Sequence, residues 1–126
     1  PYVDSHQISL EQMFQICDVI SLHVHVTDET KHMINKKLFG LVKKDLYLIN
    51  TSRGEIVNEN NIVEALKNKK LSGYGTDVVE HEFNDLKKSP IINAMNEGEN
   101  IIVTPHIGGM TIEGQTKAYE WSIKKL

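Results

Sequence analysis

The stretch Leu46-Tyr47-Leu48-Ile49-Asn50-Thr51-Ser52-Arg53-Gly54 decides how the rest of this 126-residue chain is interpreted. Residues 46–50 form a nearly continuous apolar run, which is typical of a parallel β-strand covered on both faces. Polar side chains and a glycine follow directly. Ligands bind at the carboxyl ends of strands in open α/β sheets, so the stretch predicts a buried strand with a site at its end.

Helical and strand-like patterns alternate on both sides of this stretch. Ser9, Asn58 and Thr111 are suitable N-cap residues, and each precedes a segment with a helical pattern. We expect helices over residues 10–16, 35–42, 58–70, 91–95 and 111–126, and strands over residues 19–24, 46–50, 72–79 and 101–103. This alternation predicts an α/β fold with right-handed crossovers. It corresponds to a partial doubly wound, Rossmann-like parallel sheet, the second half of a dinucleotide-binding domain.

Composition and charge narrow the possible partners. Fourteen basic and 17 acidic residues give a formal charge of −3, too mild for a nucleic-acid-binding protein. The longest apolar runs are only as long as strands, so we expect no membrane-spanning helix. The first residues lack the pattern of a signal peptide, and the single Cys17 excludes an internal disulfide. These features predict a soluble, cytoplasmic protein.

Polar residues follow three of the predicted strands and carry the chemistry of a candidate site. The segments are residues 50–54 with Arg53, residues 77–82 with two glutamates, and residues 104–109 with His106. An arginine can hold a carboxylate through two parallel hydrogen bonds. A histidine exchanges a proton near neutral pH, and a neighbouring carboxylate orients the imidazole and favours its protonated form. Together they predict a site for an anionic substrate with a carbonyl group.

Each of these residues also has a structural interpretation. Taken alone, Arg53 is typical of a surface loop and His106 of a hydrogen-bonded structural histidine. His23 and His25 share one face of a predicted strand, but no third ligand accompanies them, so the sequence predicts no metal site. We expect His32 to be exposed, Cys17 to be a small core residue, and Trp121 to pack against a neighbouring element.

Three motifs resemble those of the D-isomer-specific 2-hydroxyacid dehydrogenase family, and its phosphoglycerate dehydrogenase branch is most similar. Residues 21–24, Ser-Leu-His-Val, followed by Thr27, Glu29 and Thr30, resemble the family's strand-and-loop signature. Residues 50–54 match its arginine motif, and residues 104–109, Thr-Pro-His-Ile-Gly-Gly, match its histidine motif. The resemblance covers nearly the whole chain, with the motifs in the family's order.

The resemblance implies an NAD(H)-dependent oxidoreductase that interconverts a 2-hydroxy acid and a 2-oxo acid. Arg53 would bind the substrate, His106 would act as acid and base, and Glu82 would pair with the histidine. Glu82 stands five residues after Asp77, as the family spacing requires, so Glu80 is interpreted as a solvated loop acid. The implied cofactor-binding residues are Thr51, Ser52, Arg53, Asp77, His106, Gly108 and Gly109. The cofactor would be NAD, with NADP as the alternative, and the full-length protein a homodimer.

Part of the family pattern is missing or altered. His25 and Phe83 stand where the family commonly has proline. The resemblance therefore does not predict the loop geometry at these two positions. No GxGxxG sequence occurs in the chain. The chain also starts with Pro1 rather than Met and ends in a helical pattern. We therefore expect residues 1–126 to be a partial NAD-binding domain of a longer protein, without the glycine-rich loop and the substrate domain.

A second interpretation belongs to another functional class. A dehydrogenase-like corepressor, or another module that senses NAD(H) without turning over a substrate, keeps the same three residues. Arg53, Glu82 and His106 therefore do not distinguish such a module from an enzyme. Turnover of a 2-oxo acid would distinguish an enzyme from such a module.

Overall fold

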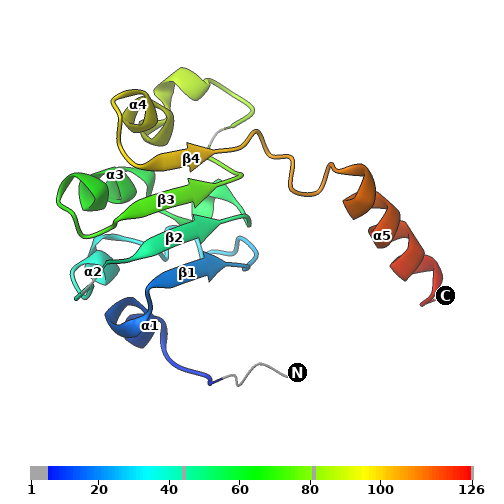
Figure 1. The fold of residues 1–126 in the computed structure, drawn as a ribbon, viewed down its shortest axis with the longest axis horizontal. Helices are drawn as coiled ribbons and strands as arrows, with labels where there is room; N and C mark the ends of the chain where they lie inside the picture. Colours follow the sequence, from blue (N-terminus) through cyan, green and yellow to red (C-terminus); the bar gives the residue numbers. More distant parts are fainter. Residues whose placement is uncertain (1–5, 44, 81, 126) are drawn as a thin grey trace.

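A four-stranded parallel sheet forms the centre of the computed structural model, which describes residues 6–43, 45–80 and 82–125. The strands are β1 (Val19–Leu22), β2 (Tyr47–Asn50), β3 (Gly73–Thr76) and β4 (Ile101–Val103), and they lie side by side in this order. All neighbours pair in parallel, so Leu22, Asn50 and Thr76 lie in register where their strands end. These carboxyl-terminal ends form the carboxyl edge of the sheet. Figure 1 shows the four strands pointing to that edge. The predicted parallel α/β sheet is confirmed.

Helices connect the strands, and the three predicted caps are confirmed. The helices are α1 (Leu10–Ile16), α2 (Lys36–Phe39), α3 (Glu59–Lys67), α4 (Pro90–Asn96) and α5 (Ile112–Ile123), with 3-10 turns η1 (Gly54–Ile56) and η2 (Leu86–Lys88). The side chains of Ser9, Asn58 and Thr111 each accept a hydrogen bond from a backbone N–H in the first turn of their helix. Such a bond satisfies a donor that has no partner within the helix.

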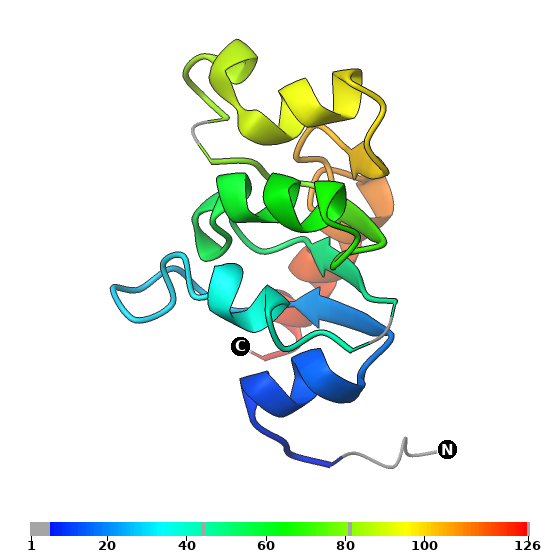
Figure 2. The ribbon, with the colours of Figure 1, turned by 90° about the vertical axis from the view of Figure 1, so that its left-hand side faces the viewer.

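One face of the sheet carries the hydrophobic core. Ile20, Leu22 and Leu48 point to this face and are buried. Ile62 of α3 and Ile91 of α4 belong to the same cluster and are 0% exposed. Each such side chain stabilises the fold by about 1.5–3 kcal/mol relative to exposure in water. Figure 2 shows α2, α3 and α4 in front of the sheet, on the side of this core.

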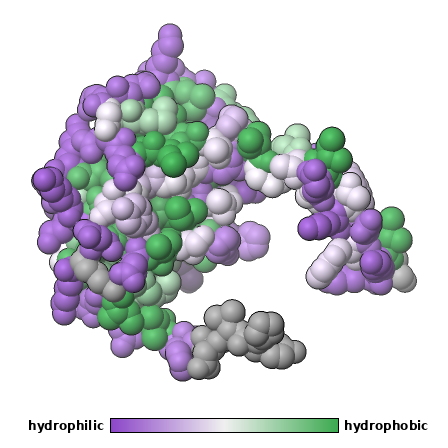
Figure 3. Space-filling view, in the orientation of Figure 1, coloured by the Kyte–Doolittle hydropathy of each residue, from purple (hydrophilic) through white to green (hydrophobic). Residues whose placement is uncertain are grey.

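The opposite face of the sheet is open among the described residues. Val19, Tyr47 and Ile102 point to it and are 59%, 46% and 68% exposed. Helix α5 stands away from the strands (Figure 1), and apolar side chains gather over the sheet in the space-filling view (Figure 3). The expectation that the strand at residues 46–50 is covered on both faces is therefore wrong for the described part of the chain. An apolar run supplies side chains for two faces, but it does not determine which element covers them.

Two strands are shorter than predicted. The strand expected over residues 19–24 ends at Leu22, because the N–H of Val24 donates to Oγ of Ser52 (3.2 Å) instead of continuing the ladder. The strand expected over residues 72–79 ends at Thr76, whose hydroxyl bonds with the backbone of Val78. Both strands thus stop where a side chain replaces a backbone partner.

Helix ends also differ from the expectation, for local backbone reasons. The helix expected over residues 58–70 ends at Lys67, because Lys69 adopts a left-handed conformation with φ of 55°. The helix expected over residues 35–42 ends at Phe39, because the N–H of Leu41 donates three residues back in a turn. The last helix ends at Ile123, and residue 126 lies outside the described residues.

The terminal helix makes little contact with the sheet. No residue of α5 is buried, and Trp121 is 67% exposed. The neighbour expected for Trp121 is thus not among the described residues. Cys17 is half-buried and packs against the core, as predicted. Within the described ranges, no helix is long and apolar enough to cross a bilayer.

Candidate active site

The sheet brings the arginine, glutamate and histidine of the three polar segments to one cavity. The cavity measures about 420 Å³, and its walls include Arg53, Glu82, Phe83 and His106. Arg53 follows β2, Glu82 comes from the loop after β3, and His106 follows β4. The expected meeting of these strand ends is therefore observed. The roles of the three residues stay predictions.

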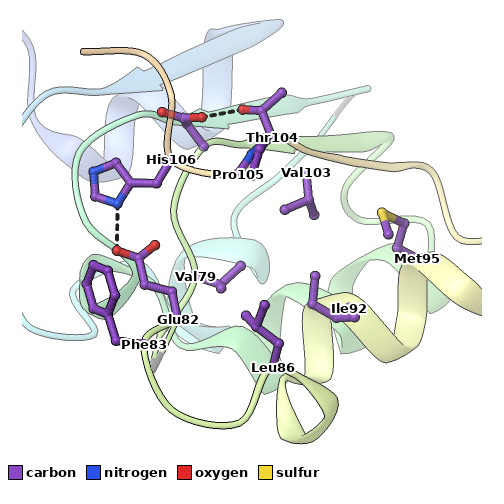
Figure 4. A pocket seen from close by; sticks show the side chains of 11 residues that line it. Val79, Glu82, Phe83, Leu86, Ile92, Met95, Val103, Thr104, Pro105 and His106 are labelled. Carbon is purple, nitrogen blue, oxygen red and sulfur yellow. Dashed lines mark hydrogen bonds and ion pairs between the residues drawn. The ribbon is translucent and has the colours of Figure 1, made fainter. Parts of the chain in front are cut away.

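His106 and Glu82 form a direct pair. Nδ1 of His106 lies 2.6 Å from Oε1 of Glu82 (Figure 4). A carboxylate only accepts hydrogen bonds, so Nδ1–H donates and Nε2 is the ring nitrogen left for a ligand. The carboxylate side chain is 17% exposed and the imidazole 38%, so water shields the pair only in part. The arrangement suits an imidazole that gives and takes a proton through Nε2.

The backbone at His106 is held in a strained conformation. Its φ is 54°, in the left-handed region that side chains other than glycine rarely adopt. Such strain costs about 1–3 kcal/mol and persists only where surrounding contacts enforce it. Asp77 supplies those contacts: Oδ1 accepts from Ile107 N–H (3.0 Å) and from the hydroxyl of Thr104 (2.5 Å). Its Oδ2 accepts from Gly108 N–H (2.8 Å).

These bonds change the acidity of Asp77. Burial by itself raises the pKa of this carboxyl group. Hydrogen bonds from Thr104, Gly108 and Ile107, together with the nearby His106, outweigh burial and hold the pKa below its ordinary value of 3.8. Asp77 is thus an anion that organises residues 104–109, the loop that carries His106 (the histidine loop). The sequence identified the residue but not this function, because its partners lie some 30 positions further along the chain.

Asn50 shapes the loop that carries Arg53. It is fully buried; its amide donates to the carbonyl of Arg53 (2.9 Å), and its oxygen accepts from Ser52 N–H (3.0 Å). The guanidinium donates to the carbonyl of Ser52 (2.6 Å) and borders the cavity. Arg53 is the only arginine in the chain, so this is its one candidate for binding a carboxylate through two parallel bonds.

The predicted cofactor-binding residues divide into two kinds. Ser52 is buried, and its hydroxyl donates to the carbonyl of Leu22 (2.6 Å), so its side chain ties β2 to β1 rather than facing a ligand. Thr51, Gly108 and Gly109 are exposed at the carboxyl edge. A Cβ on Gly108 would lie 3.0 Å from Oδ2 of Asp77, so a larger residue there would press on the carboxylate.

Two expectations about the surrounding loops are wrong. Glu80 is not a solvated loop acid: its side chain is 18% exposed, and Oε2 lies 3.0 Å from Nε2 of His32. His32, expected to be exposed, is half-buried in the same pair. Sequence reasoning missed this contact because 48 residues separate the partners. The buried Glu59, which accepts from the N–H of Glu80 (2.8 Å), was also missed.

A second, largely apolar cavity of about 330 Å³ adjoins the pair of His106 and Glu82 (Figure 4). Val79, Leu86, Ile92, Met95 and Val103 form its apolar lining. Phe83, one of the departures from the family pattern, also lines this cavity, with 88% of its surface exposed. Its ring centroid is 6.4 Å from that of His106.

The described residues contain no cluster of three or more histidine, cysteine or acidic side chains placed to hold a metal ion. His23 and His25 follow the end of β1, so they do not share a strand face as expected. Nε2 of His23 bonds with Oγ of Ser21 (2.8 Å).

Comparison with protein families gives a match over residues 2–108. The matching model describes the NAD binding domain of D-isomer specific 2-hydroxyacid dehydrogenases. The chain is 39% identical to a D-3-phosphoglycerate dehydrogenase of Haemophilus influenzae, over 85% of the chain and 26% of that protein. It is 37% identical to a glyoxylate reductase of Thermococcus litoralis, over 98% of the chain and 36% of the relative.

A solved structure shows the same arrangement of elements. D-lactate dehydrogenase with NAD+ from Lactobacillus jensenii superposes with a TM-score of 0.77 at 31% identity. The match covers 93% of this chain and 38% of the other. The chain spans about a quarter of the length of the phosphoglycerate dehydrogenases that it resembles.

Proposed function

The chain belongs to the D-isomer-specific 2-hydroxyacid dehydrogenase family, and from this we propose the function of the whole protein. It interconverts a 2-hydroxy acid and a 2-oxo acid by hydride transfer with NAD(H). Residues 1–126 supply part of the NAD-binding domain and three groups of the active site, Arg53, Glu82 and His106. The observation that supports this most directly is the pairing of His106 with Glu82 beside the cavity that Arg53 borders.

The residues at the carboxyl edge are suited to the nicotinamide end of the cofactor. Among the described residues, Oδ2 of Asp77 accepts one hydrogen bond, from Gly108, so it has capacity to accept a second from a carboxamide N–H. Thr51 and Gly109 are exposed at the same carboxyl edge. The GxGxxG loop that binds the pyrophosphate does not occur in these residues, so this chain would hold only one end of NAD.

In reduction of a 2-oxo acid, Arg53 would hold the substrate carboxylate and keep the neighbouring carbonyl oxygen near Nε2 of His106. When bound, reduced nicotinamide supplies the hydride to C2. As negative charge develops on the carbonyl oxygen, the protonated imidazole gives its proton from Nε2. Glu82 keeps Nδ1–H in place throughout, so the ring presents the same nitrogen to the substrate in both directions. In oxidation, Nε2 takes the hydroxyl proton, and the carboxylate of Glu82 stabilises the resulting imidazolium.

Steady-state kinetics of the complete protein test this proposal. We expect turnover of at least one compound in a panel of 2-oxo acids with NADH, and loss of turnover when His106 is replaced by alanine. NADH binding without turnover of any compound in the panel would favour the corepressor-like module instead. The homodimer and the cytoplasmic location stay predictions, which sedimentation and fractionation can check.

A further inference from the structure

His32 connects the two loops that carry Arg53 and Glu82. It lies in the segment between β1 and α2. Its backbone N–H donates to the carbonyl of Glu55 (2.8 Å), two residues after Arg53. Its ring Nε2 lies 3.0 Å from Oε2 of Glu80, two residues before Glu82. One residue therefore contacts both loops, each within two positions of a proposed active-site residue.

The contact is held from several sides. His32 has a φ of 52°, a left-handed conformation that a side chain other than glycine adopts only where contacts enforce it. On the other side of the pair, Oε1 of Glu59 accepts from the N–H of Glu80 (2.8 Å), and Oε2 of Glu59 accepts from the hydroxyl of Ser89 (3.0 Å). Glu59 and Ser89 are each only 5% exposed. Both the side chain and the backbone of Glu80 are thus fixed.

The two loops also touch each other directly. A Cβ on Gly54 would lie only 2.2 Å from the backbone of Val79 and Glu80. The loop that carries Arg53 (the arginine loop) therefore packs closely against the loop that carries Glu82 (the glutamate loop). His32 itself lines a separate polar cavity of about 280 Å³, with Glu59, Glu80 and Lys88, and not the cavity of Arg53 and His106. It is therefore placed to act through the loops and not on a substrate.

We propose that His32 is a positioning residue. Its bond to Glu80 holds the glutamate loop against the arginine loop, and so keeps Glu82 within reach of His106 while Arg53 faces the same cavity. The proposal rests on the proposed function for its kinetic consequence, but its geometric consequence at His106 does not depend on turnover.

The test compares His32→Ala with His32→Gln in the complete protein. Both variants keep the backbone N–H that donates to Glu55, and the Gln amide can still donate to Glu80. A displacement of about 1 Å costs on the order of a hundredfold in rate. We expect His32→Ala to lower kcat by roughly tenfold or more at nearly unchanged NADH Kd, and His32→Gln to restore most of the loss. Lys36→Ala, which removes an exposed ion pair with Glu64, is the control and keeps the parent kcat.

A second arm separates positioning from loss of folded protein. Rates are expressed per folded molecule, from the unfolding transition of each variant. In a Glu82→Gln background the additional effect of His32→Ala is expected to shrink, because the group that it positions is already altered. The proposal is overturned if His32→Ala lowers kcat by the same factor in both backgrounds, or if His32→Ala keeps the kinetics of the parent.

An activity-independent readout covers the case in which the proposed function fails. In histidine-labelled protein, the imidazole ¹⁵N signals of His106 report the bond from Nδ1 to Glu82. We expect His32→Ala to shift these signals, with little change in His32→Gln and Lys36→Ala. If the parent turns over no 2-oxo acid but the signals move in this way, the positioning role stands and the dehydrogenase proposal fails. Unchanged signals in His32→Ala reject the positioning role.

Discussion

Oε1 of Glu82 accepts a hydrogen bond from Nδ1 of His106 at 2.6 Å, although 24 residues separate the two. The bond engages Nδ1, so Nε2 is the ring nitrogen left for a ligand, and it sets the tautomer of the neutral ring. His106 is also held at a φ of 54° by the contacts that Asp77 makes with the next two residues. The position and the orientation of the imidazole thus have separate causes, and they can be tested separately.

The first prediction concerns orientation and charge at His106. Glu82→Gln keeps an oxygen that can accept from Nδ1 but removes the charge that stabilises an imidazolium. We expect kcat for oxidation of the 2-hydroxy acid to fall on the order of a hundredfold. Glu97→Gln changes a glutamate in an exposed ion pair with Lys67 and should leave kcat as in the parent. Steady-state kinetics measure both, and equal rates for Glu82→Gln and the parent would contradict the assignment.

The second prediction concerns Arg53. Arg53→Lys keeps the positive charge but loses the planar pair of donors. We expect kcat/KM for 2-oxo acids to fall on the order of a hundredfold, because the carbonyl is no longer aligned with His106. NADH affinity, measured by fluorescence titration, should change little. If the lysine variant turns over at the parent rate, the carboxylate is bound elsewhere.

The third prediction uses the lowered pKa of Asp77. A carboxyl group with a lowered folded pKa stabilises the fold above its unfolded pKa, and this contribution is lost as the pH falls through the folded pKa. Asp77→Asn places an amide donor among the N–H groups of Ile107 and Gly108. We expect a loss of about 1–3 kcal/mol at pH 7, since one of these part-buried N–H donors loses its acceptor. The difference from the parent should shrink below the ordinary pKa of 3.8.

Denaturant unfolding of the chain at neutral and acid pH measures this effect. Asp28→Asn is the matched control, because Asp28 is exposed in the loop after β1. It should leave the free energy of unfolding nearly unchanged at both values. A pH-independent loss in Asp77→Asn would show that the charge of the carboxylate is not what stabilises the histidine loop.

The fourth prediction concerns the contact between the arginine and glutamate loops. Gly54→Ala would place a methyl group 2.2 Å from the backbone of Val79, which cannot move as a flexible side chain would. We expect a destabilisation of about 3 kcal/mol. Gly109→Ala has no atom within 4 Å of the added carbon and should cost far less. Thermal unfolding compares the two, and similar transition temperatures would refute the close packing.

The fifth prediction concerns the cofactor. Without a GxGxxG loop, these 126 residues lack the helix N-terminus that binds the pyrophosphate. We expect the isolated chain to bind NAD weakly or not at all in titration calorimetry. Micromolar affinity would mean that the carboxyl edge around Asp77 and His106 is a sufficient site.

The order of elements, the caps and the three motifs could be read from the sequence because they depend on nearby residues. The apolar run before Asn50 predicts a strand. Asn58 predicts the start of a helix, because its side chain accepts from the N–H of Asn61, only three residues further along the chain. Element ends were less predictable. Ser52 stops β1 from a position 30 residues away, so no local pattern marks Leu22 as the last residue of the strand.

The sequence by itself determined a parallel α/β fold, the family, and the candidates Arg53, Glu82 and His106, since periodicity and motif spacing are properties of short segments. Only the tertiary structure decided that Glu80 pairs with His32, that Asp77 organises the histidine loop, and that one face of β2 stays open in the described residues. These relationships join side chains dozens of residues apart. They arise because parallel strands deliver their loops to one edge, where burial and hydrogen bonding, and not order along the chain, select the partners.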